Sequence, residues 1–187
     1  AFEGMGCEVE LVEHVFDDPV DLFNAEFFAG AGTRLKPVLT ERREILDPAV
    51  ARTLDKALAQ TMGDYYASVF RRYDLRTKVC AFFERFDALL TPTLPVAAFD
   101  AAADYAPGLA SDDDVLAWIF YTYPFNLTGL PAASIPAGFT KAGLPVGLQI
   151  VGRHLGESLI FRLAAAFEEA RPWNTVRPPL TYGSRAA

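Results

Sequence analysis

The sequence predicts an α/β protein with a layered α/β/α arrangement, in which helices cover both faces of a mixed sheet. Short apolar runs of strand length occur at residues 87–95, 132–138 and 144–152. Segments with apolar residues at helical spacings of three and four alternate with these runs. Of the 187 residues, 51% are hydrophobic, which is enough to bury a sizeable core between layers.

The N-terminal segment is expected to contribute a further strand. Acidic and apolar side chains alternate from Cys7 to Glu13, a period of two that is typical of a strand with one buried face. Gly4 and Gly6 precede it, as at a turn from helix to strand. We therefore expect residues 1–3 to be the end of a helix whose body is absent.

Two helix starts are marked by an aspartate followed by proline. The pair Asp18-Pro19 predicts a helix that ends at the glycines of 30–32. The pair Asp47-Pro48 predicts one long amphipathic helix that continues, or kinks, as far as Phe86.

The C-terminal half is expected to hold the other elements. A strand within 87–95 leads into a loop at 95–110, and Ser111 to Asp114 cap a helix from Val115 to about Tyr123, which Pro124 ends or kinks. Strands at 132–138 and 144–152 flank a turn at 141–143. A last helix runs from Glu157 to Arg171.

Charge and composition exclude several functions. Seventeen Lys and Arg against 24 Asp and Glu give a net charge of −7, which disfavours a general basic surface for nucleic acid. No apolar run is long enough to span a membrane. The two cysteines, Cys7 and Cys80, are expected to be reduced thiols of a cytoplasmic protein.

The inventory of reactive side chains identifies no reaction by itself. The two histidines, His14 and His154, do not lie at a metal-ligand spacing, and Asp112 to Asp114 are better explained by helix capping. There is no Gly-x-Ser-x-Gly elbow and no glycine-rich phosphate loop. We expect neither a metal nor a cofactor.

Three motifs occur in a characteristic order. They are FDALLTPT at 86–93, FNLTGLPAASIPAG at 125–138 and GLPVGLQIVG at 143–152. Together they resemble the C-terminal region of the amidase signature family. The resemblance implies an enzyme that hydrolyses a carboxamide through an acyl-enzyme intermediate. It also implies that the chain has the C-terminal part of the amidase signature fold.

The catalytic residues of that family are a Ser nucleophile, a second Ser in a cis peptide and a Lys base, all in its N-terminal half. None of the serines or lysines here stands in a Gly/Ser-rich setting. The resemblance therefore implies that residues 1–187 are a single C-terminal fragment of a larger amidase domain. We expect the fragment to lack catalytic residues and to be inactive alone.

The resemblance implies a role for the segment before Asn126 in binding a small-molecule amide. Ile119, Tyr123 and Phe125 are the expected pocket residues, with core packing as the alternative for each. Relatives of the amidotransferase A subunit usually carry an Asp where Ile119 stands, so an apolar or aromatic acyl group is favoured. The amides of Asn126 and Gln149 are expected to bond neighbouring backbone groups.

Two alternatives stay open. The chain could be the same portion of a glutamyl-tRNA amidotransferase A subunit, which works with partner subunits and tRNA. It could also be a binding or scaffold module that kept the fold without the active site. In each case a sheet with an uncovered edge or face favours association, and we expect a homodimer through exposed apolar surface.

Overall fold

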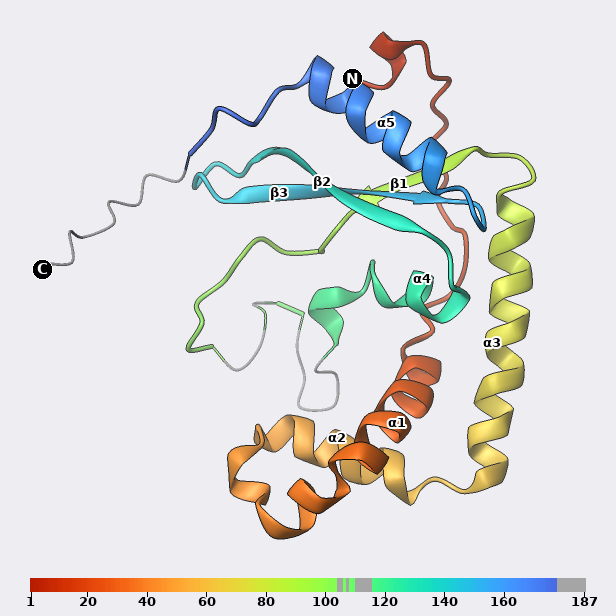
Figure 1. The fold of residues 1–187 in the computed structure, drawn as a ribbon, viewed down its shortest axis with the longest axis vertical. Coiled ribbons are helices and arrows are strands. Elements are labelled where there is room, and N and C mark those ends of the chain that lie inside the picture. The colour runs from red at the N-terminus through yellow and green to blue at the C-terminus, as the bar shows by residue number, and fades with distance from the viewer. Residues whose placement is uncertain (104–105, 107, 110–115, 178–187) are drawn as a thin grey trace, which may run out of the picture.

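The computed structural model describes residues 1–103, 106, 108–109 and 116–177. Its described part has one sheet, formed by β1 (Ala88–Pro92), β2 (Ala132–Phe139) and β3 (Pro145–Gly152), in the order β1-β3-β2. Helix α5 (Glu157–Ala170) covers one face. Helices α1 (Val20–Glu41), α2 (Pro48–Ala59) and α4 (Tyr123–Thr128) lie on the other side, and α3 (Met62–Phe82) stands along the edge (Figure 1). The layered α/β/α prediction is confirmed, with antiparallel strands in place of the mixed sheet.

The two faces of the sheet bury different cores, because successive strand side chains point to opposite sides. Leu90 and Ile150 face α5 and pack with Ile160, Phe167 and Phe2. The opposite face holds Leu89 and Val151, which join the larger core. Its other buried members include Leu22, Phe23, Leu54, Val79, Tyr123 and Phe125. The predicted strands at 87–95, 132–138 and 144–152 are thus confirmed, as are the turn at 141–143 and the last helix.

The strand predicted from Cys7 to Glu13 is absent. This segment is irregular, and Leu11 is almost fully exposed. Alternating side chains are compatible with a strand, but a strand also needs a hydrogen-bonded neighbour, and none of the described strands pairs with this segment. Ala1 and Phe2 precede a 3-10 turn (Glu3–Met5), which ends at Gly6 with φ of 86°.

Helix α1 begins at Val20, one residue later than the Asp18-Pro19 pair predicts, so Pro19 is its N-cap. The Asp18 carboxylate accepts from the Val20 backbone N–H at 3.0 Å. The predicted end of α1 at Gly30 to Gly32 is wrong, because the helix continues to Glu41. Gly32 instead lies against α2, where a Cβ would sit 2.9 Å from Leu58 Cγ. The glycine allows the two helices to approach closely. A 3-10 turn (Arg43–Ile45) then connects them.

The single long helix expected from Pro48 to Phe86 is two helices. Asp47 caps α2 by accepting from the backbone N–H groups of Ala49 and Val50. Thr61 and Asp64 then form a capping box that starts α3. Hydrogen bonds from the Thr61 side chain and backbone hold the pKa of Asp64 below its ordinary value. Apolar periodicity continues across the break, so it could not reveal the new start.

The helix expected from Val115 to Tyr123 is also corrected. Residues 111–115 lie outside the described part, which leaves the predicted Ser111 cap without a structural outcome. The chain next forms a 3-10 turn (Ala117–Ile119), and α4 begins at Tyr123, where the helix was expected to end. Pro124 occupies the first turn of α4, where its missing N–H costs no intrahelical hydrogen bond.

Candidate functional site

The three predicted pocket residues, Ile119, Tyr123 and Phe125, lie on the segment that precedes β2. This segment contains the 3-10 turn (Ala117–Ile119) and α4. Tyr123 and Phe125 are buried in the larger core, and Ile119 packs against it while partly exposed. The Tyr123 ring lies 5.2 Å from that of Phe23, and Phe125 meets Phe16 edge-on at 6.0 Å. Core packing therefore accounts for the burial of Tyr123 and Phe125.

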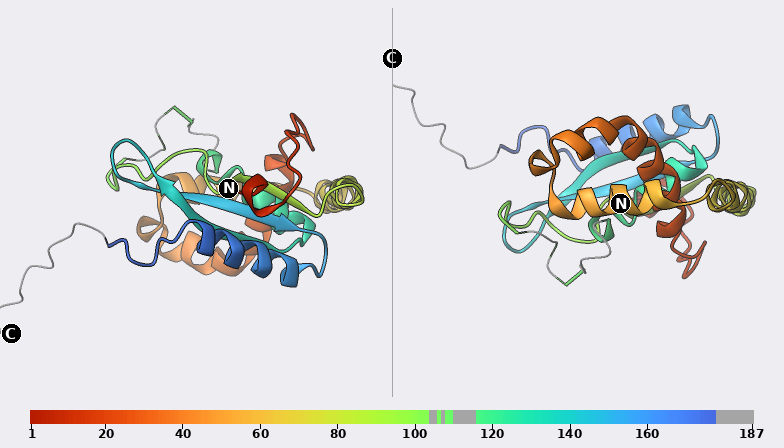
Figure 2. Two further views of the ribbon diagram at one scale, coloured as in Figure 1. Left: turned by 90° about the horizontal axis from the view of Figure 1, so that it is seen from above. Right: turned by 90° about the horizontal axis from the view of Figure 1, so that it is seen from below.

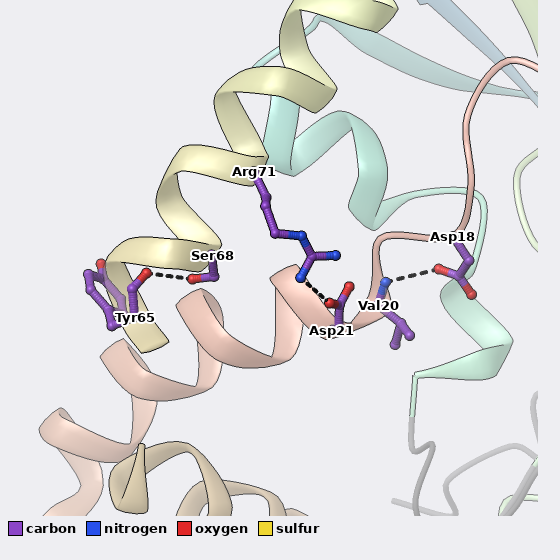
Figure 3. A network of polar contacts seen from close by, with 6 residues as sticks. All are labelled: Asp18, Val20, Asp21, Tyr65, Ser68 and Arg71. Atoms are coloured by element: carbon purple, nitrogen blue, oxygen red, sulfur yellow. Dashed lines mark hydrogen bonds and ion pairs between the residues drawn. The ribbon is translucent and has the colours of Figure 1, made fainter. Parts of the chain in front are cut away.

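A carboxylate fixes the start of α4. The Tyr123 hydroxyl donates to Asp18 Oδ1, the atom that also accepts from the Val20 N–H at the start of α1. Figure 3 shows Asp18 aimed at Val20, with Asp21 in the first turn of α1 paired to Arg71 of α3. The starts of α1 and α4 are thus held by one side chain.

Two arginines of α3 meet the C-terminal end of α4. Arg76 donates to the carbonyl oxygen of Thr128, and Arg72 Nη1 lies 3.5 Å from that of Leu127. Positive charge is favourable at this end, because the last carbonyls of a helix carry partial negative charge. Gly129 closes the helix with φ of 64°. This contact fixes where the chain leaves α4 for β2.

Gln149 connects the predicted pocket segment to the sheet. Its side chain is buried, and Nε2 donates to Thr91 Oγ1 at 3.0 Å and to the carbonyl oxygen of Tyr121 at 2.7 Å. The hydrogen bond expected from this amide to a neighbouring backbone group is confirmed by the contact with Tyr121. Asn126 differs, because it is exposed and needs no buried partner.

A row of neutral polar groups crosses the sheet next to this connection. Gln149 of β3 is in register with Thr91 of β1 and with Ser134 of β2. Ser134 Oγ lies 2.6 Å from Thr93 Oγ1, above Gly147, where a Cβ would come within 2.7 Å of the Thr93 hydroxyl. These groups can bind and orient a ligand by hydrogen bonds. Neutral hydroxyls and amides are weak bases, so this row does not supply a general base.

Sequence reasoning did not identify this polar row. Thr91 and Thr93, and likewise Gly147 and Gln149, are two residues apart along their strands, a spacing that puts the members of each pair on one face. The missing information was the register that brings Ser134 beside them. No three His, Cys, Asp or Glu side chains gather as a metal site within the described ranges. None of the described helices has the length and apolarity that a membrane crossing needs.

Comparison with known proteins assigns the class. Residues 34–161 match the family model described as Amidase. The chain belongs to the amidase signature family, and its fold is that of these enzymes. A crystal structure of a bacterial aryl acylamidase of this family is similar, with a TM-score of 0.79 and 26% identity, over 92% of this chain and 38% of that one.

Two curated relatives are similar in sequence. The glutamyl-tRNA(Gln) amidotransferase A subunit of Cyanothece is 39% identical over 145 residues, which cover 74% of this chain and 29% of the relative. The acylamidase of Rhodococcus erythropolis is 41% identical over 110 residues, covering 57% of this chain and 23% of the relative. The chain therefore spans less than a third of the length of these relatives.

Proposed function

We propose that this chain is the C-terminal part of an amidase that hydrolyses a small carboxamide through a serine acyl-enzyme. The observation that carries the proposal is the similarity to an aryl acylamidase over 92% of the chain. The acylamidase relative at 41% identity supports the same activity. The two cysteines are free thiols, which supports a cytoplasmic location.

The catalytic Ser-Ser-Lys set is proposed to lie outside residues 1–187. Two of the serines here have ordinary structural partners: Ser68 Oγ donates to the carbonyl of Tyr65 within α3 (Figure 3), and Ser134 bonds Thr93. The small share of each relative that the chain covers supports the same proposal. The 187-residue chain is therefore inactive alone.

Within the complete enzyme, the segment from Ile119 to Phe125 forms part of the acyl-pocket wall. Ile119 is the residue of the three that is not enclosed by the core, so it is available to touch a substrate. Tyr123 and Phe125 support the wall from the core side, where both are buried. Because Ile119 is apolar, it suits an apolar or aromatic acyl group and cannot pair with an α-amino group.

The alternative is a role as the corresponding part of a glutamyl-tRNA amidotransferase A subunit. The relative from Cyanothece favours it. That interpretation requires a glutamine donor, for which the apolar side chain of Ile119 offers no partner.

The test first compares the 187-residue chain with the complete enzyme, and then compares acyl amides on an Ile119 variant of the complete enzyme. Purified residues 1–187 should not hydrolyse p-nitroacetanilide, whereas the complete reading frame from the source gene should. In the complete enzyme, Ile119→Asp should lower kcat/KM for an aromatic acyl amide at least tenfold more than for acetamide. Hydrolysis of glutamine instead would support the amidotransferase interpretation.

Two results would contradict the proposal. Hydrolysis by the 187-residue chain would place catalytic groups within it. A source gene with a start codon directly before Ala1 would support a non-catalytic module of this fold.

A further inference from the structure

The outward side of α3 is apolar over three turns. Met62, Tyr66, Phe70 and Tyr73 are 71%, 52%, 64% and 55% exposed. Their spacings of four, four and three residues place them in one line along the helix. We call these four residues the α3 stripe.

The stripe lies opposite the side by which α3 joins the molecule. Ser68, Leu75 and Val79 are buried on that inner side, and Arg71 and Arg72 pair there with Asp21 and Glu26 of α1. Both views in Figure 2 show α3 end-on at the margin of the molecule. No other described element covers its outer side.

The stripe has the composition of an interface core. Single exposed apolar side chains are ordinary, but contiguous ones mark contact sites. Here the Tyr66 and Phe70 rings lie 6.4 Å apart and adjoin each other. None of the four side chains is charged, and aromatic residues and Met are enriched where proteins meet while charges are depleted.

We propose that the α3 stripe binds a second copy of this chain, with the two α3 helices antiparallel across a two-fold axis. A two-fold contact requires a surface that complements itself. The stripe meets this condition because its spacing is nearly symmetric about a point between Tyr66 and Phe70. Tyr66 then meets the partner's Phe70, and Met62 meets the partner's Tyr73, a favourable pairing of sulfur and ring.

The area available sets the expected strength. An aromatic side chain offers about 150–250 Å², so three half-exposed rings and Met62 supply roughly 400 Å² per copy. Stable complexes bury about 800 Å² per partner. Flanking side chains such as Ala67 and Thr77 add to the contact, and the total places the dimer at the weak end. We expect a Kd on the order of 10 μM.

The test is sedimentation velocity on the 187-residue chain from about 1 to 200 μM. The wild type should shift from monomer to dimer across this range. Phe70→Asp should weaken association at least tenfold, because it puts a carboxylate at the centre of the contact in both copies. The matched control is Phe161→Asp on α5, where Phe161 is similarly exposed at 71% but isolated from the stripe, and it should dimerise like the wild type.

A charge pair tests the antiparallel register. Tyr66→Lys alone should also weaken association, whereas an equimolar mixture of Tyr66→Lys and Phe70→Asp chains should associate at least tenfold better than either alone. The new ammonium and carboxylate face each other only in the antiparallel arrangement. Circular dichroism identical to that of the wild type shows that each variant is folded.

Three results would overturn the proposal. They are a monomeric wild type at 200 μM, a dimer that Phe70→Asp leaves intact, and equal dissociation by Phe161→Asp. A mixture that fails to recover association would overturn the antiparallel pairing.

Discussion

Gln149 shows how one side chain connects separate parts of the site. Its Nε2 donates one hydrogen bond to the Thr91 hydroxyl of β1 and another to the backbone carbonyl of Tyr121, in the loop before α4. The sequence indicated that this amide needed partners, because it stands in an apolar strand. It could not identify Tyr121, since that contact depends on how a distant loop crosses the sheet.

Replacing Gln149 by Leu should therefore destabilise the fold by about 1–3 kcal/mol, because both acceptors lose their donor in a buried place. Urea denaturation of the 187-residue chain measures this change. Ser134→Ala is the control in the same row, and its exposed hydroxyl should cost less than about 0.5 kcal/mol. Equal losses for the two variants would contradict the role assigned to Gln149.

Ile119, Tyr123 and Phe125 show a limit of sequence reasoning at the same scale. All three are apolar or aromatic, so they fit both a pocket wall and a core. Burial separates them in the structure, since Tyr123 and Phe125 are enclosed and Ile119 is not. The sequence carries no information on that difference, because it depends on which segments fold over each side chain.

Helix starts and ends were predictable where a local group decides them. Asp47 caps α2 as its sequence indicates, because an aspartate at the N-cap accepts hydrogen bonds from the free N–H groups of the first helical turn. The end of α1 was not predictable from Gly30 and Gly32, because the close contact of α2 at Gly32 favours continuing the helix despite the low helix propensity of glycine.

Neighbouring arginines of α3 should differ sharply in their contribution to stability. Arg72 lies 2.8 Å from Glu26 in a mostly buried pair, and the other oxygen of Glu26 has no hydrogen-bond partner within the described part. Arg72→Met leaves the Glu26 carboxylate without its charged partner and should lower the free energy of unfolding by about 2–4 kcal/mol. Arg71→Met is the control, since its pair with Asp21 is more than half exposed and worth less than about 1 kcal/mol. Thermal and urea unfolding would rank the two, and a larger loss for Arg71→Met would be inconsistent with this burial.

The capping box of α3 should make stability depend on acid pH. Asp64 has a lowered pKa when folded, so the stabilisation from its ionised form is complete above its ordinary pKa of about 3.9. That stabilisation is lost as the pH falls through the lower folded-state pKa.

The measurement is the difference in unfolding midpoint between the wild type and Asp64→Asn across about pH 2 to 7. The difference should be largest near neutrality and vanish at the acid end. In a Thr61→Val background it should shrink at every pH, because the main hydrogen-bond donor to Asp64 is removed. A difference that grows toward acid pH would refute the assignment.

At the scale of the whole molecule, the layered α/β/α order followed from the alternation of apolar runs and helical periodicity. The antiparallel pairing of β2 with β3 follows from the short turn between them. The place and direction of β1 beside β3 did not follow, because local periodicity carries neither strand order nor register. The irregular segment of residues 7–13 has the same cause, since its alternating pattern lacks a pairing strand among those described.

The N-terminal segment of the chain packs against the last helix, α5. Phe2 stacks on Phe167 of α5 with ring centroids 5.4 Å apart, and both are buried. Phe167→Ala should cost about 3–5 kcal/mol and should release residues 1–6 to proteolysis. Phe161→Ala on the same helix removes an exposed ring and should change stability by less than about 0.5 kcal/mol. Limited proteolysis with mass spectrometry follows the N-terminal segment, and continued protection in Phe167→Ala would count against this contact.

The central position of β3 has a consequence for unfolding. This strand bonds to a neighbour on each edge, and its adjacent residues Ile150 and Val151 belong to the cores on opposite faces. Neither helical layer can leave without exposing part of the same strand to water. The amides of β3 should therefore exchange with deuterium only through global opening, and the two cores should melt as one cooperative unit.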